Sequence, residues 1–309
     1  MQCPVCSQTE NIKPIRELRT TKITGSWLYK DIEVMECENC GHGFNRLYAD
    51  AKLKDFYRYE YGKTRYSEPV SSEIGLNQEI GSLILSQANP ELQQAWLQAI
   101  LDIHDEHYSD FPESDIISLN HFLEHCWEPE NVLKMASMRL SEAGLLHISV
   151  PDYSRYKQTV NDDIPYLFLI KEHIQHFTLT SLNFLCSQYG FYQKESTTGE
   201  IGLFKDRLKM PVLDAYFSKI NPNGLYCYGA GRELMYLLES DVRLNTVKIS
   251  GIIDDVPEKR GLKINGIEVF SSSIVPHLSE KAKIYISAVY YRPEIEENLK
   301  KLGYRGKIT

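Results

Sequence analysis

Four cysteines near the start of the sequence have the type and spacing of a metal site. Cys3 and Cys6 form one C-x-x-C pair, and Cys37 and Cys40 form a second pair. Such a turn directs two sulfur atoms to one side, and two turns together place four thiolates at tetrahedral corners, which suits Zn²⁺. Four protein ligands leave no open position, so the sequence predicts a structural zinc ribbon. A pair of redox-active or free thiols is the alternative.

Two short strands are expected to position these cysteines. Residues 12–29 and 31–35 predict strands, and the second leads directly into Cys37. Gly41 follows the second pair, where a tight turn often needs a positive φ. His42 is expected to be a polar residue of this turn, with a role as substitute ligand as the alternative.

The composition indicates a protein of two or three compact units. Its 309 residues are more than one core usually organises. The formal net charge of −8 and the lack of a Lys/Arg block disfavour nucleic-acid and membrane-surface partners. No apolar run approaches the roughly 18 residues that span a bilayer, and the start of the chain lacks an apolar secretory segment. Because four of the seven cysteines fall in C-x-x-C pairs, we expect a reducing, cytoplasmic location.

A strand–helix–strand pattern occupies the middle of the chain. Residues 115–119 predict a buried strand that leads into Glu124 and His125. Residues 130–140 predict an amphipathic helix ended by Gly144, and residues 145–150 a second strand. Short loops between such elements are typical of a parallel α/β sheet.

Two segments carry a family resemblance. The segment DIISLNHFLEHCWEPENVLKMASMRLSEAGLLHISVPD at 115–152 resembles the second half of a class I S-adenosylmethionine-dependent methyltransferase. The segment KEHIQHFTLTSLNFLCSQYGF at 171–191 is similar to a downstream motif of the same family. A four-cysteine ribbon before such a domain resembles the layout of the sugar C-methyltransferases, which methylate keto-deoxysugars carried on nucleotides.

The resemblance implies roles for individual residues. Glu172 and His173 match the acid/base pair that removes a proton next to the sugar ketone, a task that suits imidazole. His176 stands where the family usually has tyrosine, and Tyr166 is a further catalytic candidate. The alternative is a helix start capped by Thr178 or Thr180, with the histidines bonded to backbone.

We also expect Glu124 and His125, at the end of the first strand of the pattern, to contribute to cofactor binding.

The cofactor half of such a domain is expected to be missing. The family binds S-adenosylmethionine mainly through a glycine-rich turn after its first strand, and no G-x-G occurs between Tyr66 and Asp115. We expect two helices over residues 74–103. The candidate first strand, residues 99–103, precedes His104 instead of glycine. Eleven residues then separate Ile103 from Asp115, too few for the missing strands and crossovers.

The C-terminal third has the outline of a nucleotide fold. Residues 225–228 predict a strand, and Gly229 and Gly231 predict a turn that opens a helix at 234–239. Residues 247–253 predict the next strand, which ends in Asp254. The segment GIIDDVPEKRGLKINGIEVF at 251–270 resembles the Rossmann-like domain at the C-terminus of sugar C-methyltransferases. We therefore expect Gly229, Gly231 and Asp254 to bind a nucleotide or nucleotide-sugar, with a turn that serves packing alone as the alternative.

Together these features predict an α/β protein of three domains. They are a zinc ribbon at 1–48, an incomplete class I methyltransferase-like sheet at 49–205, and a Rossmann-like domain at 206–309. The expected function is that of a methyltransferase-like protein acting on or binding a nucleotide-linked sugar. An inactive binding or partner subunit, joined by a protein that supplies the missing half, is the alternative. The expected cofactor is structural Zn²⁺. S-adenosylmethionine is implied by the family resemblance alone, because the glycine-rich turn that would bind it is missing. A nucleic-acid adaptor is disfavoured by the acidic charge.

Overall fold

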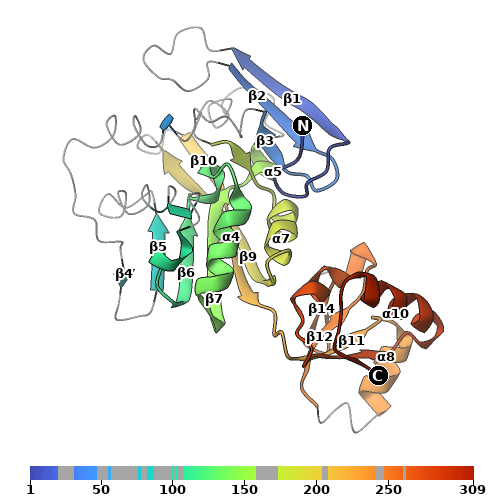
Figure 1. Ribbon diagram of the computed structural model, residues 1–309. Helices are drawn as coiled ribbons and strands as arrows, with labels where there is room; N and C mark the ends of the chain where they lie inside the picture. Colours follow the sequence, from blue (N-terminus) through green and yellow to red (C-terminus); the bar gives the residue numbers. More distant parts are fainter. Residues whose placement is uncertain are drawn as a thin grey trace. The chain divides into compact units, whose positions relative to one another are not determined.

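The chain folds into two compact units. The computed structural model describes residues 1–19, 31–46, 55–56, 76–77, 82–86, 99, 102–103, 107–157, 173–203, 208–240, 247–259 and 262–309. The first unit comprises Met1–Cys186 and Gln193–Ser218, and the second comprises Ser187–Tyr192 and Lys219–Thr309 (Figure 1). The ribbon and the central sheet both belong to the first unit, and the domain boundaries expected at residues 48 and 205 stay predictions.

The ribbon is a small antiparallel sheet. Strand β1 (Ile12–Arg19) pairs with β2 (Asp31–Cys37), and β2 pairs with β3 (Gly43–Asn45). The fourth strand, β8 (Gln175–His176), comes from the segment far downstream and pairs with β3. Ile32, Val34 and Phe44 are buried. The ribbon is therefore joined to the rest of the first unit by shared strand pairing as well as by side-chain packing.

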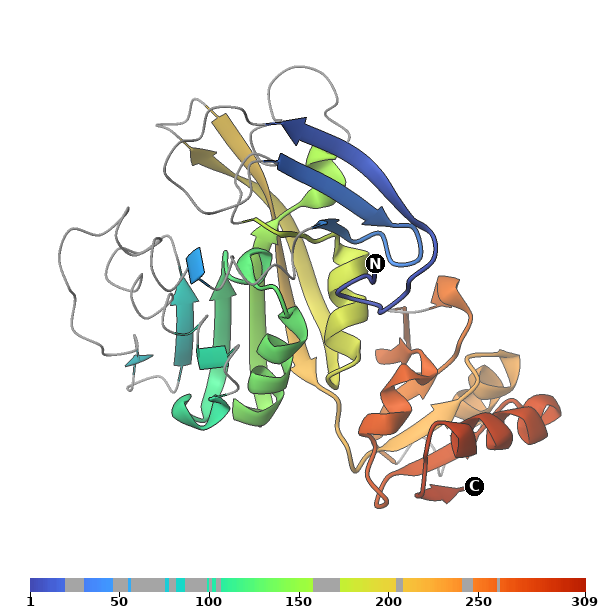
Figure 2. The same ribbon diagram turned by 45° about the horizontal axis from the view of Figure 1, so that its top comes forward.

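The larger sheet of the first unit has the order β4-β5-β6-β7-β10-β9. Its strands are β4 (Leu76–Asn77), β5 (Ser82–Ser86), β6 (Ser114–Asn120), β7 (Leu140–Pro151), β9 (Phe191–Leu203) and β10 (Leu208–Lys219). β5, β6 and β7 are parallel, whereas β10 runs antiparallel to β7. Helices α4 (Pro129–Arg139) and α7 (Leu179–Ser187) lie along one face (Figure 2). The predicted unit of strand, helix and parallel strand is thus present as β6, α4 and β7.

Three expectations about local structure are wrong. The helix expected around residues 74–88 is replaced by β4 and β5, because a short apolar run such as Ser82–Ser86 suits either structure and pairing with β6 decides it. The strand expected at 99–103 is helical where it is described, at residues 99 and 102–103. Helix α4 ends at Arg139, and β7 already begins at Leu140, so Gly144 lies inside a strand.

The second unit is a Rossmann-like α/β domain. Its sheet has the order β13-β14-β12-β11-β15-β16, in which β14, β12, β11, β15 and β16 are parallel. The strands are β11 (Leu225–Tyr228), β12 (Ile249–Ile253), β13 (Lys263–Ile264), β14 (Ile267–Phe270), β15 (Lys283–Ile286) and β16 (Lys307–Ile308). Helix α8 (Arg232–Ser240) connects β11 to β12, and α10 (Arg292–Lys301) connects β15 to β16. The strand order reverses between β11 and β15, and ligands of open α/β sheets bind at such a point.

Candidate functional site

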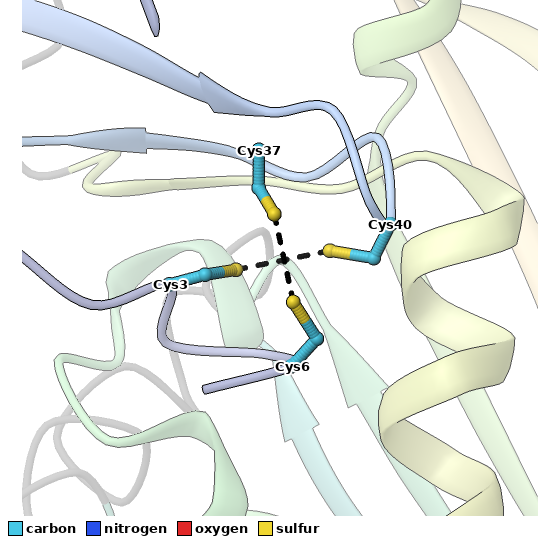
Figure 3. A group of neighbouring side chains, drawn as sticks. All are labelled: Cys3, Cys6, Cys37 and Cys40. Atoms are coloured by element: carbon cyan, nitrogen blue, oxygen red, sulfur yellow. Dashed lines mark hydrogen bonds between the residues drawn. The ribbon is translucent and has the colours of Figure 1, made fainter. Parts of the chain in front are cut away.

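The four N-terminal cysteines converge on one point, as the sequence predicts (Figure 3). All four Sγ atoms lie within 4.8 Å of one another. The Sγ atoms of Cys3 and Cys40 are 3.7 Å apart, and those of Cys6 and Cys37 are 3.5 Å apart. A tetrahedral zinc ion with Zn–S bonds of about 2.3 Å places its sulfur ligands about 3.8 Å apart. The cluster therefore fits zinc, and the distances are far too long for disulfides, whose sulfurs are about 2.05 Å apart.

The two cysteine turns have the same backbone geometry. Cys3 N donates to Gln8 O and Ser7 N donates to Cys3 O, at 2.8 and 3.0 Å. In the second turn, Cys37 N donates to His42 O and Gly41 N donates to Cys37 O, at 2.9 and 2.8 Å. The residue after each pair has a positive φ, +59° at Ser7 and +69° at Gly41. Since only glycine takes this conformation freely, Gly41 is suited to its position and Ser7 is strained.

The thiols of the cluster interact strongly. A hydrogen bond from Cys40 lowers the pKa of Cys3 to about 6. The same bond raises the pKa of Cys40, and burial raises that of Cys37. The charge of a Cys3 thiolate also raises the pKa of Cys40 and of Cys37, and a bound dication would oppose this effect by supplying positive charge.

His42 does not belong to the metal cluster. Its side chain is fully buried, and Nε2 donates to Oε1 of Gln175 at 2.9 Å. Burial lowers the pKa of His42 to about 4, so the ring is neutral near pH 7. Gln175 Nε2 in turn donates to the carbonyl oxygen of Cys126 at 2.9 Å. His42 is therefore a structural residue of the turn, and Gln175 links it to the end of the turn η4 (Leu123–His125).

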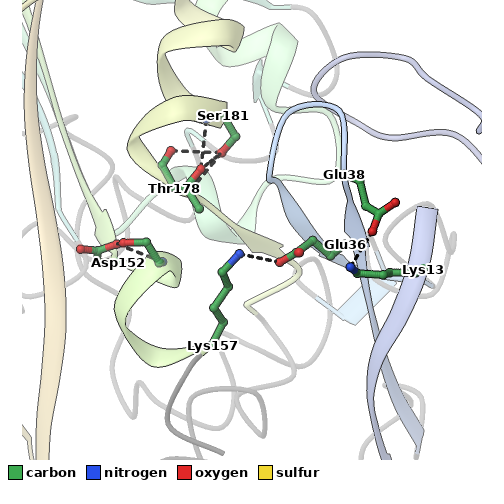
Figure 4. A network of polar contacts seen from close by, with 8 residues as sticks. Lys13, Glu36, Glu38, Asp152, Lys157, Thr178 and Ser181 are labelled. Atoms are coloured by element: carbon green, nitrogen blue, oxygen red, sulfur yellow. Dashed lines mark hydrogen bonds and ion pairs between the residues drawn. The ribbon is translucent and has the colours of Figure 1, made fainter. Parts of the chain in front are cut away.

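Charged residues add to this junction (Figure 4). Lys157 Nζ lies 2.9 Å from Glu36 Oε2, linking the ribbon strand β2 to the end of α5 (Tyr153–Tyr156). Asp152 caps α5 by accepting from Ser154 N. Thr178 caps α7, because its Oγ1 accepts from Ser181 N at 3.1 Å. The cap predicted at Thr178 is present, and the ion pair of Lys157 with Glu36 links the end of α5 to the ribbon.

The second candidate site is a buried cluster of one carboxylate and two imidazoles. Glu124 and His125 lie in the 3₁₀ turn η4 (Leu123–His125) that follows β6, and His173 comes from the segment before β8. Their exposed fractions are 0%, 1% and 8%. One ligand atom of each lies within 4.8 Å of the other two. The rings of His125 and His173 meet edge to face, with centroids 4.8 Å apart. The fold thus joins residues that the sequence assigned to separate roles.

Backbone geometry fixes this cluster. His121, at the carboxyl end of β6, has a φ of +51°, a conformation that side chains other than glycine seldom adopt. The tight turn that follows brings Glu124 and His125 to buried positions. Ile174 N donates to the carbonyl oxygen of Glu124 at 2.8 Å, so the segment carrying His173 is tied to this turn.

His121 is a member of the site that sequence reasoning missed. Its Nδ1 lies 3.0 Å from Oε1 of Glu124. Burial by itself would lower the pKa of His121, but the hydrogen bond to Glu124 and the charge of that carboxylate raise it. A histidine three residues before a glutamate in a turn is the signal that could have indicated this pair.

His176, another predicted catalytic residue, lies outside this cluster. His176 is buried in β8, and its Nδ1 accepts from the hydroxyl of Tyr156 at 2.6 Å. Burial lowers the pKa of His176 to about 3. Its ring packs with those of Tyr153 and Tyr156, and it is not among the three grouped donors. Glu172 and Tyr166 lie outside the described residues.

The glycine turn of the second unit is present between β11 and α8. Gly229 has a φ of +108°, and a Cβ there would lie 2.6 Å from that of Ala288, so the fold itself requires this glycine. A Cβ on Gly231 would meet no described atom within 4 Å. The carboxylate of Asp254 accepts from Ala230 N, Val256 N and Lys259 Nζ at 2.8, 3.0 and 2.9 Å. Asp254 therefore organises the turn, and its role toward a nucleotide stays a prediction.

A pocket of about 770 Å³ lies at the carboxyl ends of β11, β12 and β15. This is the point where the strand order reverses, and the volume suits a small molecule. Among the described residues that line it, Glu233, Asp254, Asp255 and Glu294 are carboxylates and Lys259 is a cation. The carboxylates favour a neutral or cationic portion of a ligand beside them.

The sequence after β5 lacks the glycines of the usual cofactor turn. β5 lies beside β6 in the sheet, and its carboxyl end at Ser86 is followed by Gln87, Ala88, Asn89 and Pro90. No glycine is available there for a close approach of backbone to a ligand. Residues 87–113 must make the whole crossover from β5 to β6, which leaves too little chain for two further strands with their crossovers. The residues present therefore do not fit the ordinary S-adenosylmethionine site.

The comparisons with known proteins agree with this architecture. Residues 50–195 match the family model described as "Methyltransferase domain". This part of the chain is methyltransferase-like. No curated protein matches the sequence. No helix in the described part of the chain is long and apolar enough to cross a membrane.

Several solved structures are similar to the methyltransferase-like part. An S-adenosylmethionine-dependent methyltransferase from Methanosarcina mazei is 14% identical with a TM-score of 0.30, covering 45% of this chain and 82% of that one. The N-methyltransferase NodS from Bradyrhizobium japonicum is 12% identical with a TM-score of 0.26, covering 45% and 73%. The mitomycin 7-O-methyltransferase MmcR is 10% identical with a TM-score of 0.30, covering 45% and 41%. These TM-scores are too low to support an argument. The match of residues 50–195 to the family model is therefore the evidence that this part of the chain is methyltransferase-like.

Proposed function

We propose that this methyltransferase-like protein acts on a nucleotide-linked keto-deoxysugar, with Glu124, His125 and His173 as its reactive centre. The observation that carries the proposal is the convergence of these three buried side chains beyond the carboxyl end of β6. Ligands of α/β sheets bind at this edge. The sugar is supported by the resemblance of the cysteine ribbon, the central segments and the C-terminal domain, in that order, to the sugar C-methyltransferases.

The chemistry proposed for this centre is removal of a proton from the carbon beside a ketone. A neutral imidazole accepts such a proton at physiological pH. His173 is the proposed base, since its ring belongs to the group and it is the most exposed of the three. The carboxylate of Glu124, which lies within 4.8 Å of the His173 ligand atom, would stabilise the imidazolium that forms. The electron pair left on carbon becomes an enolate. The proposed step needs no S-adenosylmethionine, and the sequence after β5 lacks the glycines of the usual turn for that cofactor.

Proton removal can be measured without methyl transfer. We expect the full-length protein to exchange the proton beside the ketone with deuterium from D₂O, followed by NMR on a nucleotide-linked keto-deoxysugar. His173→Ala should abolish the exchange while leaving folding intact. The control is His147→Ala, because His147 contacts Ser118 and Asp214 and is not among the grouped donors. Exchange at the wild-type rate in His173→Ala would refute the role of His173.

The second candidate is a non-catalytic binding or partner subunit. It is favoured by the residues after β5, which lack the glycine turn of an ordinary cofactor site. Calorimetric titration with S-adenosylmethionine separates the two candidates. Micromolar binding supports an active transferase. No binding, either by the chain alone or with a candidate partner chain, refutes independent methyl transfer and supports the partner subunit.

A further inference from the structure

We propose that Glu124, His125 and His173 bind one divalent first-row transition-metal ion, at a site separate from the four-cysteine cluster. The inference concerns metal binding and goes beyond the proposed function. Two imidazoles and one carboxylate form a ligand set that both iron(II) and zinc sites use, with further positions left open for water or a substrate oxygen.

The distances between the donor atoms suit one ion. Imidazole nitrogen and carboxylate oxygen bind such metals at about 2.0–2.2 Å, so neighbouring ligand atoms lie about 3 to 4 Å apart. The three donor atoms of Glu124, His125 and His173 already lie within 4.8 Å of one another. Rotation of the side chains alone can close the remaining difference. The near-perpendicular rings of the two histidines, at 89°, let each ring approach a shared ion from its own direction.

The unsatisfied carboxylate oxygen is the second observation that points to a ligand. Glu124 is fully buried, and its Oε1 contacts Nδ1 of His121 at 3.0 Å. Its Oε2 is also buried, and no hydrogen-bond partner for it exists among the described residues. Leaving a buried charged oxygen without a partner is costly, and a cation removes that cost. The contact from His121 is the kind of outer contact that orients a carboxylate ligand.

The backbone holds the three ligands before any ion binds. The positive φ of His121 begins the turn, and the hydrogen bond from Ile174 N to Glu124 O joins the two segments. A site that is organised in advance loses little conformational entropy on binding.

Metal binding and the base role of His173 exclude each other, because a coordinated nitrogen has no electron pair for a proton. Metal binding should therefore also slow the exchange of the sugar proton.

The test is the number of Co²⁺ ions bound by the full-length, metal-stripped protein. We expect two per chain after dialysis: one in the cysteine cluster, with the sulfur-to-cobalt charge-transfer absorption of thiolate sites, and one without it. Glu124→Gln, His125→Gln and His173→Gln should each reduce the count from two to one and keep the thiolate absorption. The control His147→Gln should keep two ions.

The variants also separate metal loss from unfolding. A folded cysteine cluster keeps its thiolate absorption, so a variant that retains this band and binds one ion supports the proposal. His173→Gln is the variant least expected to disturb folding, since His173 is the most exposed of the three. One ion per wild-type chain, or two ions in a folded His173→Gln protein, would overturn the proposal. The ion count needs no turnover, so it can be measured whether or not the metal-free protein exchanges the sugar proton.

Discussion

Replacement of Gln175 by alanine tests how the ribbon is joined to the central sheet. Gln175 is 1% exposed, accepts from His42 Nε2 and donates to the carbonyl oxygen of Cys126, both at 2.9 Å. Alanine would leave both partners buried and unpaired. Each such group costs about 1–3 kcal/mol, so the free energy of unfolding of the first unit should fall by about 2–6 kcal/mol. This is a large share of the ~5–15 kcal/mol that stabilises a typical domain.

Urea unfolding followed by tryptophan fluorescence measures this loss. All three tryptophans, at 27, 96 and 127, belong to the sequence of the first unit, so the signal reports that unit. The matched control is Gln193→Ala. Gln193 is half-buried and has two side-chain hydrogen bonds, from Asn183 and to Ser196. Water can replace these bonds, so we expect a loss below about 1.5 kcal/mol. The comparison uses zinc-loaded Gln175→Ala and Gln193→Ala proteins. If both lost the same free energy of unfolding, with an unchanged slope against urea concentration, the role of Gln175 in holding the ribbon would be refuted.

Further predictions concern the cysteine turns, the zinc ion and pH. Gly41→Ala should lower the free energy of unfolding by about 1–2 kcal/mol, because Gly41 has a positive φ. Ser7→Gly should leave this free energy unchanged or raise it slightly. Equal losses in the two variants, measured by urea unfolding, would contradict the shared turn geometry. Removal of zinc by a chelator should lower the urea concentration at the unfolding midpoint of the first unit and expose four thiols to a thiol reagent. Cys40→Ser should weaken zinc binding. If the chelator left the midpoint unchanged, a structural role of the ion would be contradicted.

Because burial lowers the pKa of His176 to about 3, while the unfolded value is about 6.5, the unfolded chain binds more protons between these values. Stability should therefore fall as pH decreases from about 6.5 toward 3, by about 1.4 kcal/mol per unit for this group. His176→Gln, which retains an acceptor for Tyr156, should show a weaker pH dependence in urea titrations, and an unchanged dependence would exclude this histidine as its source.

Local patterns predicted much of the fold. The unit of β6, α4 and β7 could be predicted because each element has its own hydrophobic period and the loops between them are short. The β11–α8–β12 unit was predicted for the same reason. β5 was not, because the five residues Ser82–Ser86 are too few to distinguish a strand from a buried helix turn. Its pairing with β6 is a contact between segments distant in sequence, which no local pattern contains.

The sites show the same division. The spacing of Cys3, Cys6, Cys37 and Cys40 was enough to predict that their sulfur atoms converge, since each C-x-x-C pair forms its own turn. Glu124, His125 and His173 were each recognised as candidates, but nothing in the sequence indicated that they meet. His121 and Gln175 were missed, because their roles depend on a positive φ and on burial against a distant segment.

The sequence by itself determined the four-cysteine ribbon and the two units β6–α4–β7 and β11–α8–β12. Only the tertiary structure decided which of the histidines lie together. The pairing of β3 with β8 and the bond from Ile174 N to Glu124 O place His173 beside Glu124 and His125, while His176 packs with Tyr156. The physical reason is that side-chain types and periods are local properties, whereas strand register and burial depend on the whole folded chain.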